Sequence, residues 1–207
     1  MRQTAVKLLF VVVLSAFLTG GCASQQRALF NSQNLKGWKL FIPDENVDVS
    51  TVWSVTDGVI RCEGQPFGYM RTIEDYENYK LHVEWRWVDK GSNSGVLLHM
   101  SEPDKVWPKS IEGQLMSGNA GDFYLIGGTG IKEQGEGSRV PKKHESNERP
   151  LGQWNEYDIF CNGDTIELFV NGLLQNKGTE ATVTSGKICL QSEGAPIEFR
   201  NIYIEPL

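Results

Sequence analysis

Apolar and polar residues alternate in short runs from Ala28 to the end of the chain, and turn residues separate the runs. No apolar stripe keeps the helical period of 3.6 residues for more than about two turns. Alternation with a period of two places successive side chains on opposite faces of a strand. The pairs Asp57-Gly58 and Asn171-Gly172 predict hairpin turns between such runs. We therefore predict an all-β protein of roughly a dozen strands.

The most regular alternation runs from residue 80 to residue 87. Its apolar side chains would lie on one face of a strand, and His82, Glu84 and Arg86 on the other. This polar face is either the solvent side of an antiparallel sheet or one wall of a binding site, and the sequence favours neither strongly.

The densest group of polar residues lies between residues 91 and 121. Two alternating runs, 96–100 and 111–115, flank a turn that contains proline. In the second run Glu112 and Gln114 share one face, and the apolar side chains share the other. If both runs pair beside the strand at 80–87, the side chains that converge on one face are Glu84, His99, Glu112 and Gln114.

Residues 127–153 contain few large apolar residues and many glycines and charges, so we expect a long loop. Loops of this length in compact domains are commonly functional lids or mobile insertions. We expect its His144 to be solvated and without a catalytic role. The many short strands and turns elsewhere fit a two-sheet sandwich or jelly roll.

The first 22 residues have the pattern of an export signal. Two basic residues precede the apolar run Leu8–Leu18, which is too short to span a membrane comfortably. The run ends in Thr-Gly-Gly-Cys, which resembles a bacterial lipoprotein cleavage site with Cys22 as the lipidated first residue. The alternative is an ordinary secretory signal in which the cysteine is coincidental. We expect a tether at 23–27, one domain at 28–207, export to the bacterial cell envelope, and membrane attachment through the lipid only.

Charge and cysteine content exclude several classes of function. The chain has 20 basic and 26 acidic side chains, and removal of the leader with Arg2 and Lys7 takes the net charge from −6 to about −8. A nucleic-acid partner is therefore not expected. Cys62, Cys161 and Cys189 lack metal-site spacing and stand beside apolar residues, so we predict buried thiols with at most one disulfide.

A series of short motifs extends over almost all of the chain after the leader. The motifs are Leu29–Asn31, Leu35–Trp38, Asp57-Gly58, Gly68–Thr72, Tyr79–Trp87, Asn93–Gly95, Glu112–Gln114, Trp154-Asn155, Asn171-Gly172, Leu190-Gln191 and Phe199–Ile202. In this order they resemble the 3-keto-disaccharide hydrolase-like domain family (DUF1080). The ordered set is specific, although each motif alone is weak.

The resemblance implies a concanavalin-like jelly roll, in which two antiparallel sheets form a β-sandwich and one sheet has a concave face that holds sugar. It also implies a carbohydrate partner and a hydrolase or lyase that cleaves glycosides oxidised to a ketone at carbon 3. Within the family that the chain resembles, some members serve as binding or accessory modules. A non-catalytic carbohydrate-binding lipoprotein on the same fold is therefore the alternative function, and a scaffold of an envelope complex is a third.

Most glycosidases use two carboxylates that flank the scissile bond. Related sandwich hydrolases take them from one strand with the pattern Glu-x-Asp-x-x-Glu, and here that window reads Glu112, Gln114 and Ser117. A second carboxylate would have to come from Glu84 or Glu193. A 3-keto sugar needs less, because the ketone acidifies the proton on carbon 2, so one general base, a group that polarises the ketone and an acid for the leaving group suffice.

Pattern and resemblance together suggest a role for each candidate. The general base is Glu112 or His99, and Lys109 or Arg86 would lie near the developing oxyanion. Many family members have a histidine after Leu-Gln, where this chain has Ser192-Glu193, so the role of that position is open, and an acid there is also a candidate ligand for a divalent cation. No cofactor is otherwise indicated. The remaining candidates are a sugar-stacking platform, Trp107, and readers of hydroxyl groups, Asn93, Gln114 and Gln191.

Overall fold

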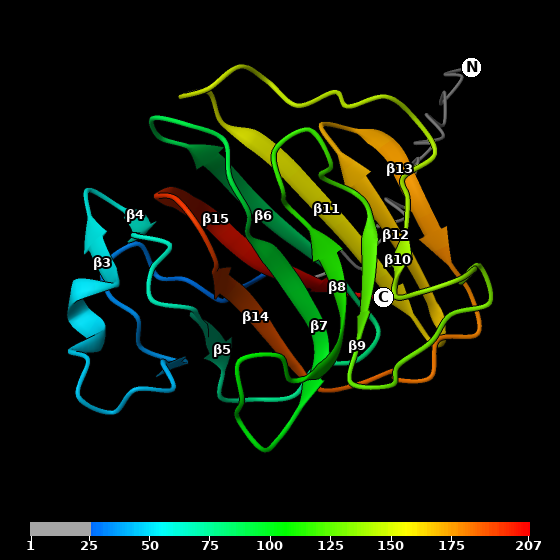
Figure 1. Ribbon diagram of the computed structural model, residues 1–207, viewed down its shortest axis with the longest axis horizontal. Coiled ribbons are helices and arrows are strands. Elements are labelled where there is room, and N and C mark those ends of the chain that lie inside the picture. Colours follow the sequence, from blue (N-terminus) through cyan, green and yellow to red (C-terminus); the bar gives the residue numbers. More distant parts are fainter. Residues whose placement is uncertain (1–25) are drawn as a thin grey trace, which may run out of the picture.

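The computed structural model describes residues 26–207 (Figure 1). The predicted leader, the lipidation site at Cys22 and tether residues 23–25 lie outside the described residues. The first described strand pairs Arg27 and Ala28 with the last strand. Within 26–207 no helix is long and apolar enough to cross a membrane.

Two antiparallel sheets pack face to face, with the seven-stranded sheet in front in Figure 1, and only one short 3-10 helix, η1 (Val49–Thr51), is present among the described residues. The predicted all-β sandwich is confirmed. The eight-stranded sheet has the order β13 (Leu173–Gly178), β12 (Thr165–Val170), β11 (Asn155–Asn162), β6 (Tyr79–Trp87), β15 (Ile197–Pro206), β4 (Val59–Cys62) and β3 (Trp53–Thr56), and β1 (Arg27–Ala28) pairs with β15. The seven-stranded sheet has the order β10 (Arg139–Val140), β9 (Phe123–Ile126), β8 (Lys109–Gln114), β7 (Gly95–Ser101), β14 (Lys187–Ser192), β5 (Gly68–Thr72) and β2 (Trp38–Phe41).

The predicted hairpins are present, and their turn residues have the backbone that such turns require. Asp57 and Gly58 have φ values of 52° and 76°, and Asn171 and Gly172 have φ values of 46° and 79°. Asn, Asp and Gly tolerate this left-handed region better than other residues, and it matches the twist of the paired strands. These turns fix the registers of β3 with β4 and of β12 with β13.

The main core lies between the two sheets and consists of the inward-facing residues of both. Trp85 and Tyr157 from the eight-stranded sheet pack at 5.6 Å between ring centroids, and Ile111 and Leu98 face them from the other sheet. A second, smaller apolar cluster covers part of the outer face of the seven-stranded sheet. The candidate site lies beside this cluster, and Ile126 contacts both. The members of the cluster are Tyr69, Leu97, Met100 and Cys189.

The predicted pairing of 80–87 with 96–100 and 111–115 is wrong. β6 belongs to the eight-stranded sheet, whereas β7 and β8 belong to the seven-stranded sheet. The chain crosses from one sheet to the other between Trp87 and Gly95. Alternation identifies the two faces of a strand but not the sheet that the strand joins.

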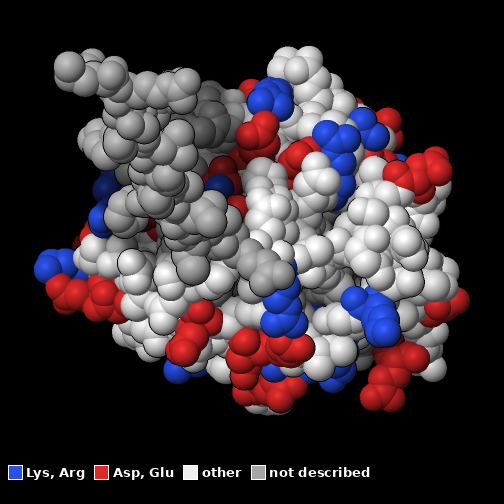
Figure 2. Space-filling view, turned by 180° about the vertical axis from the view of Figure 1, so that it is seen from behind, with Lys and Arg blue, Asp and Glu red and all other residues white. Residues whose placement is uncertain are grey.

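The polar face of β6 is accordingly the outer side of the eight-stranded sheet, as the solvent-side alternative proposed. Glu84 accepts hydrogen bonds from Arg200 at 2.6 Å and Asn201 at 2.5 Å. Arg86 donates to Glu198 at 2.6 Å and lies over the ring of Trp154. Figure 2 shows acidic and basic side chains interspersed over the side opposite to that in Figure 1.

His99 does not share a face with Glu112. It has a φ of 54°, and the four residues Leu97–Met100 of β7 lie opposite only three residues of β14, Lys187–Cys189. This extra residue is a β-bulge, which reverses the face of each side chain beyond it. The ring of His99 therefore points into the core, where Val183 O lies 3.1 Å from Nδ1 and Tyr79 packs against its edge. Because His99 lies in the core, it cannot converge with Glu112 and Gln114 on the outer face as predicted.

Two further predictions concern the cysteines and the long loop. All three described cysteines are buried and free, as predicted. Residues 127–153 contain only the two-residue strand β10, and His144 is exposed. No residue of this loop lines the candidate site described below.

Candidate active site

A pocket of about 270 Å³ lies on the outer face of the seven-stranded sheet. Its walls come from β8 and β9, from the loops that precede β7 and follow β14, and from the segment between β7 and β8. It is lined by Asn93, Trp107, Glu112, Gln114, Met116, Tyr124, Ile126 and Glu193. Four of these residues are carboxylates or amides, so the pocket offers many hydrogen-bonding groups in a small volume.

Glu112 lies at the centre of this arrangement. The alternation of β8 turns it outward from the core, and it is nevertheless only 4% exposed. Its Oε1 atom has no hydrogen-bond partner in the part of the chain that the structure describes. Burial raises the pKa of Glu112 well above its ordinary range, and the nearby charge of Glu193 raises it further. Burial therefore favours the protonated form of Glu112, in which it can act as an acid.

Gly95 of β7 provides the space that Glu112 occupies. A Cβ atom at this position would stand 2.1 Å from Oε1 of Glu112 and 2.4 Å from Oε1 of Gln191. Any larger residue would therefore displace both side chains. Gln191 is 1% exposed, and neither its oxygen nor its nitrogen has a partner among residues 26–207.

Glu193 is the second carboxyl group of the pocket. It follows directly after β14, and the pairing of Leu190 with Val96 brings this end of β14 beside the start of β7. Burial raises the pKa of Glu193, while the Asn93 side chain acts in the opposite direction by favouring the charged form. Glu112 of β8 and Glu193, which follows β14, thus form a pair of acids from distant segments of the chain.

Gln114 presents a fixed donor to the pocket. Its Oε1 accepts hydrogen bonds from the backbone N–H groups of Leu115 at 2.9 Å and Met116 at 2.8 Å. These two bonds fix which end of the amide is which, so the NH₂ group is directed away from them. Because Gln114 lines the pocket, its nitrogen is available to an acceptor on a bound molecule.

Trp107 lines the pocket, and a second exposed aromatic side chain, Phe67, lies beside it. Trp107 is 43% exposed and Phe67 is 41% exposed, and their ring centroids are 6.1 Å apart. Exposed aromatic faces beside a polar pocket are suited to stacking on the apolar faces of a ligand.

An ion cluster holds the loop that carries Trp107. Asp104 of this loop contacts Arg71 at 2.8 Å, Lys39 at 2.8 Å and the hydroxyl group of Tyr69 at 2.9 Å. Although burial acts in the opposite direction, the hydrogen bonds from Arg71, Lys39 and Tyr69 lower the pKa of Asp104 to about 2. The cluster anchors the loop to β5 and β2, and so sets the position of the rim.

The structure brings together some of the predicted site residues and separates others. Glu112, Gln114, Asn93, Trp107 and Glu193 line one pocket, and Gln191 lies beside Glu112. Residues outside the pocket are Glu84 and Arg86, on the outer face of the other sheet, His99, in the core, and Lys109, which is exposed at the start of β8.

Several residues of the site were not predicted. Tyr124 and Met116 line the pocket, Gly95 leaves it room, and Asp104 anchors its rim. The only sequence signal for any of them is the glycine that interrupts the run around residue 95, because glycine within a strand often marks a close approach of another group. The others depend on pairings between distant segments.

No group of three or more His, Cys, Asp or Glu residues suited to hold a metal ion occurs within 26–207. The oxygens of Glu112, Glu193, Asn93 and Gln191 are of the type that hard cations prefer, but only two of the four groups are acids. The cation at Glu193 therefore stays a prediction.

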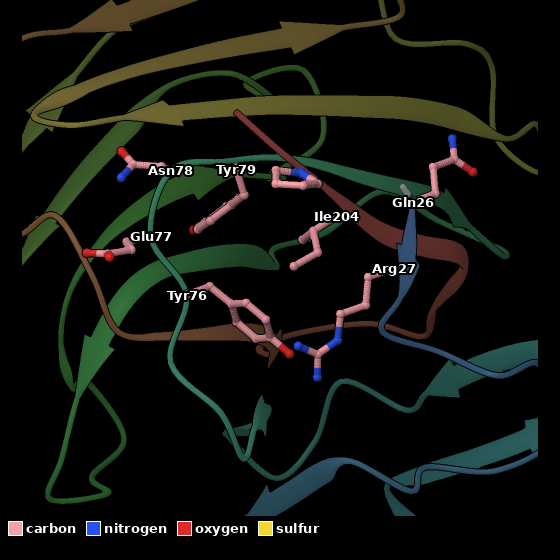
Figure 3. Close-up of a pocket in the computed structure, with 8 residues that line it drawn as sticks. Gln26, Arg27, Tyr76, Glu77, Asn78, Tyr79 and Ile204 are labelled. Atoms are coloured by element: carbon pink, nitrogen blue, oxygen red, sulfur yellow. The ribbon is translucent and has the colours of Figure 1, made fainter. Parts of the chain in front are cut away.

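A larger pocket, of about 560 Å³, lies at the other end of the fold (Figure 3). It is bordered by β1 and by the segment leading into β6, with Arg27 over the ring of Tyr76. Its carboxylate, Glu77, is exposed. Size alone does not make this pocket the better candidate, because it contains no buried acid and begins at Gln26, the first described residue.

Comparison with known proteins identifies the family of this chain. A family model described as 3-keto-alpha-glucoside-1,2-lyase-like domain matches residues 25–205. The chain belongs to this family. The match spans nearly the whole described chain and confirms the resemblance inferred from the ordered motifs. No curated protein was found to match the chain in sequence.

Solved structures share the fold at low sequence identity. A protein from Parabacteroides distasonis named "putative glycosyl hydrolase" is 24% identical, with a TM-score of 0.66, and the match covers 88% of this chain and 94% of that one. A β-glucanase from Bacillus licheniformis is 16% identical, with a TM-score of 0.58 and coverage of 91% and 99%. A carbohydrate-binding module from Bacillus subtilis is 10% identical, with a TM-score of 0.60 and coverage of 82% and 95%. This chain thus has a jelly-roll fold that is also found in a β-glucanase and in a carbohydrate-binding module.

Proposed function

We propose that this protein is an exported glycosidase-type enzyme that cleaves a glycoside or disaccharide, with a 3-keto-glycoside as the substrate class. The single observation that carries the proposal is Glu112, a buried acid without a partner that faces a pocket containing a second acid. Family membership supplies the substrate class, and the rim aromatics fit a sugar ring. Strained or unsatisfied polar groups of this kind are typical of functional sites.

The pocket has the groups that elimination from a 3-keto-glycoside requires. The Glu193 carboxylate removes the proton from carbon 2, and the electron pair enters the ketone to give an enolate. The Gln114 amide donates to the enolate oxygen in place of the predicted Lys109 or Arg86. The enolate then re-forms the ketone as a double bond forms between carbons 1 and 2, the bond from carbon 1 to the leaving oxygen breaks, and Glu112 protonates that oxygen.

Addition of water completes a net hydrolysis. Water attacks carbon 1 while ionised Glu112 takes its proton, and protonated Glu193 returns a proton to carbon 2. Both acids are then in their starting states, and no oxidant or reductant is consumed. Burial raises the pKa of both groups, so each holds a proton more readily than an ordinary carboxyl group does.

Two further parts of the proposal concern location and the alternative function. We propose anchoring at the cell envelope through a lipid on Cys22, which loss of fatty-acid labelling in a Cys22→Ser variant would support and unchanged labelling would refute. The alternative function is non-catalytic sugar binding, which is favoured by the likeness in fold to a carbohydrate-binding module.

The direct test uses a 3-keto-glucoside with a chromogenic aglycone and the purified protein without its leader. We expect release of the aglycone by the wild type, and a fall in rate of about 10²–10⁴-fold in Glu112→Gln and Glu193→Gln. Glu45→Gln is the matched control, since Glu45 is exposed in the segment after β2, an edge strand of the seven-stranded sheet.

Reaction in deuterated water adds a second readout. Proton removal at carbon 2 predicts deuterium at this carbon in the released sugar. Equal rates of aglycone release by the wild type and by Glu112→Gln would refute the assignment of Glu112 to the active site. Failure of every protein to release aglycone, together with binding of sugar, would favour the non-catalytic alternative.

A further inference from the structure

The charge of the pocket points to the kind of sugar that it accepts. Its lining residues within the described chain include two acids and no lysine, arginine or histidine. Four basic residues of the same sheet are ion-paired: Arg71 and Lys39 with Asp104, Arg139 with Asp122, and Lys187 with Asp75. A ligand in the pocket therefore meets carboxyl and amide oxygens without a neutralising cation.

Most of the unpartnered atoms at the pocket are hydrogen-bond acceptors. Oxygens of Asn93, Glu112 and Gln191 lack hydrogen-bond partners in the described part of the chain, and the one unpartnered donor beside them is Nε2 of Gln191. Asn93 and Glu112 line the pocket, and Gln191 lies beside Glu112. Gln191 is buried to more than nine-tenths, and so is Glu112. Unpartnered buried acceptors are costly until a donor satisfies them, so a ligand is favoured when it brings hydroxyl or ammonium groups.

We propose that the pocket selects glycosyl units without acidic groups, namely neutral and amino sugars, and that Glu193 excludes uronic and sulfated units. This inference rests on the proposed function. Glu193 is the residue on which selection depends because it lines the pocket and is the less buried of the two acids. A carboxylate or sulfate on the sugar would face Glu193 in a partly desolvated site, where like charges repel more strongly than in water.

The test measures binding without turnover. Phenyl glucoside, phenyl glucosaminide and phenyl glucuronide differ in one substituent and carry no ketone, so isothermal calorimetry reports their affinities directly. With wild-type protein at pH 7 we expect the glucuronide to bind at least about ten-fold more weakly than the glucoside, corresponding to ~1.4 kcal/mol. The glucosaminide should bind at least as tightly as the glucoside. Added salt should narrow these differences.

Glu193→Gln keeps the size of the side chain and removes its charge. We expect this variant to bring the glucuronide to within about three-fold of the glucoside, and Glu45→Gln to leave the wild-type ratio unchanged. Thermal denaturation of both variants establishes that they are folded.

Three results would overturn the inference. They are equal binding of glucuronide and glucoside by the wild type, an unchanged ratio in Glu193→Gln, and absence of binding for all three sugars. None of the three decides the proposed function, which release of aglycone from the 3-keto-glucoside tests separately.

Discussion

Replacement of Gly95 by alanine tests the centre of the site with one methyl group. The added carbon would stand 2.1 Å from Oε1 of Glu112 and 2.4 Å from Oε1 of Gln191, whereas ordinary contact begins at 3.4 Å. Both side chains must therefore retreat by about 1 Å, a displacement that can lower a catalytic rate about 10²-fold. Gly95 lies within β7 and is not among the glycines with positive φ, so alanine fits the backbone itself.

The expected effects on stability and on activity differ in size. Overpacking of this kind costs about 1–3 kcal/mol of unfolding free energy. For a domain of this size that corresponds to a fall in Tm of several degrees, at about 2–4 °C per kcal/mol. The catalytic efficiency should fall about 10²-fold, because the acid and its neighbour leave their positions even though the protein stays folded.

Kinetics on a 3-keto-glucoside and thermal denaturation measure the two effects separately. Gly135→Ala is the matched control, because no atom lies within 4 Å of its Cβ position and its φ is not positive. It should leave both quantities unchanged. Wild-type efficiency in Gly95→Ala would refute the reasoning, since it would show that displaced Glu112 and Gln191 side chains do not matter for the reaction.

Three further predictions follow from single contacts. The pKa of Glu112 is higher in the folded state than in the unfolded state, so folding is coupled to uptake of a proton. The stability of the wild type relative to Glu112→Gln should therefore fall as the pH rises above about 4.5. Denaturant unfolding from pH 4 to pH 8 measures this difference in stability, and a constant difference would contradict the prediction. Asp104→Asn should cost about 2 kcal/mol at pH 7. Its native pKa is about 2, so this contribution is present above the ordinary value of 3.8 and is lost as pH falls toward 2, and equal stability of the two proteins at pH 7 would contradict it. Trp107→Ala should raise KM about ten-fold with little change in Tm, because the exposed ring stacks on substrate but contributes little to the core, and an unchanged KM would exclude stacking.

The hydrophobic pattern was sufficient for local geometry. Alternation placed Glu112 and Gln114 outward and Ile111 and Leu115 inward, because the period of two in a strand leaves no other arrangement. The pairs Asp57-Gly58 and Asn171-Gly172 marked turns, because few other residues adopt their backbone. The ordered motifs identified the family, whose members share the jelly roll.

Partners across space depended on the tertiary structure. Simple alternation predicts that His99 and Leu98 point to opposite faces of β7. A bulge instead turns His99 into the core, where it contacts Val183 and Tyr79. Nothing in the local pattern marks that extra residue, because pairing with β14 and β8 determines it. Glu84 lies outside the site for a related reason. The local sequence determines which face of β6 it occupies, but not that β6 belongs to the eight-stranded sheet.

The same distinction explains the second acid. Glu193 was a candidate by resemblance to a position in the family, but its proximity to Glu112 arises because β14 pairs with β7 and β7 pairs with β8. The sequence by itself determined which side chains point away from the core. Only the packing of strands distant in the chain decided which of them share a pocket, and the resulting burial, rather than the residue types, raises the pKa of both acids.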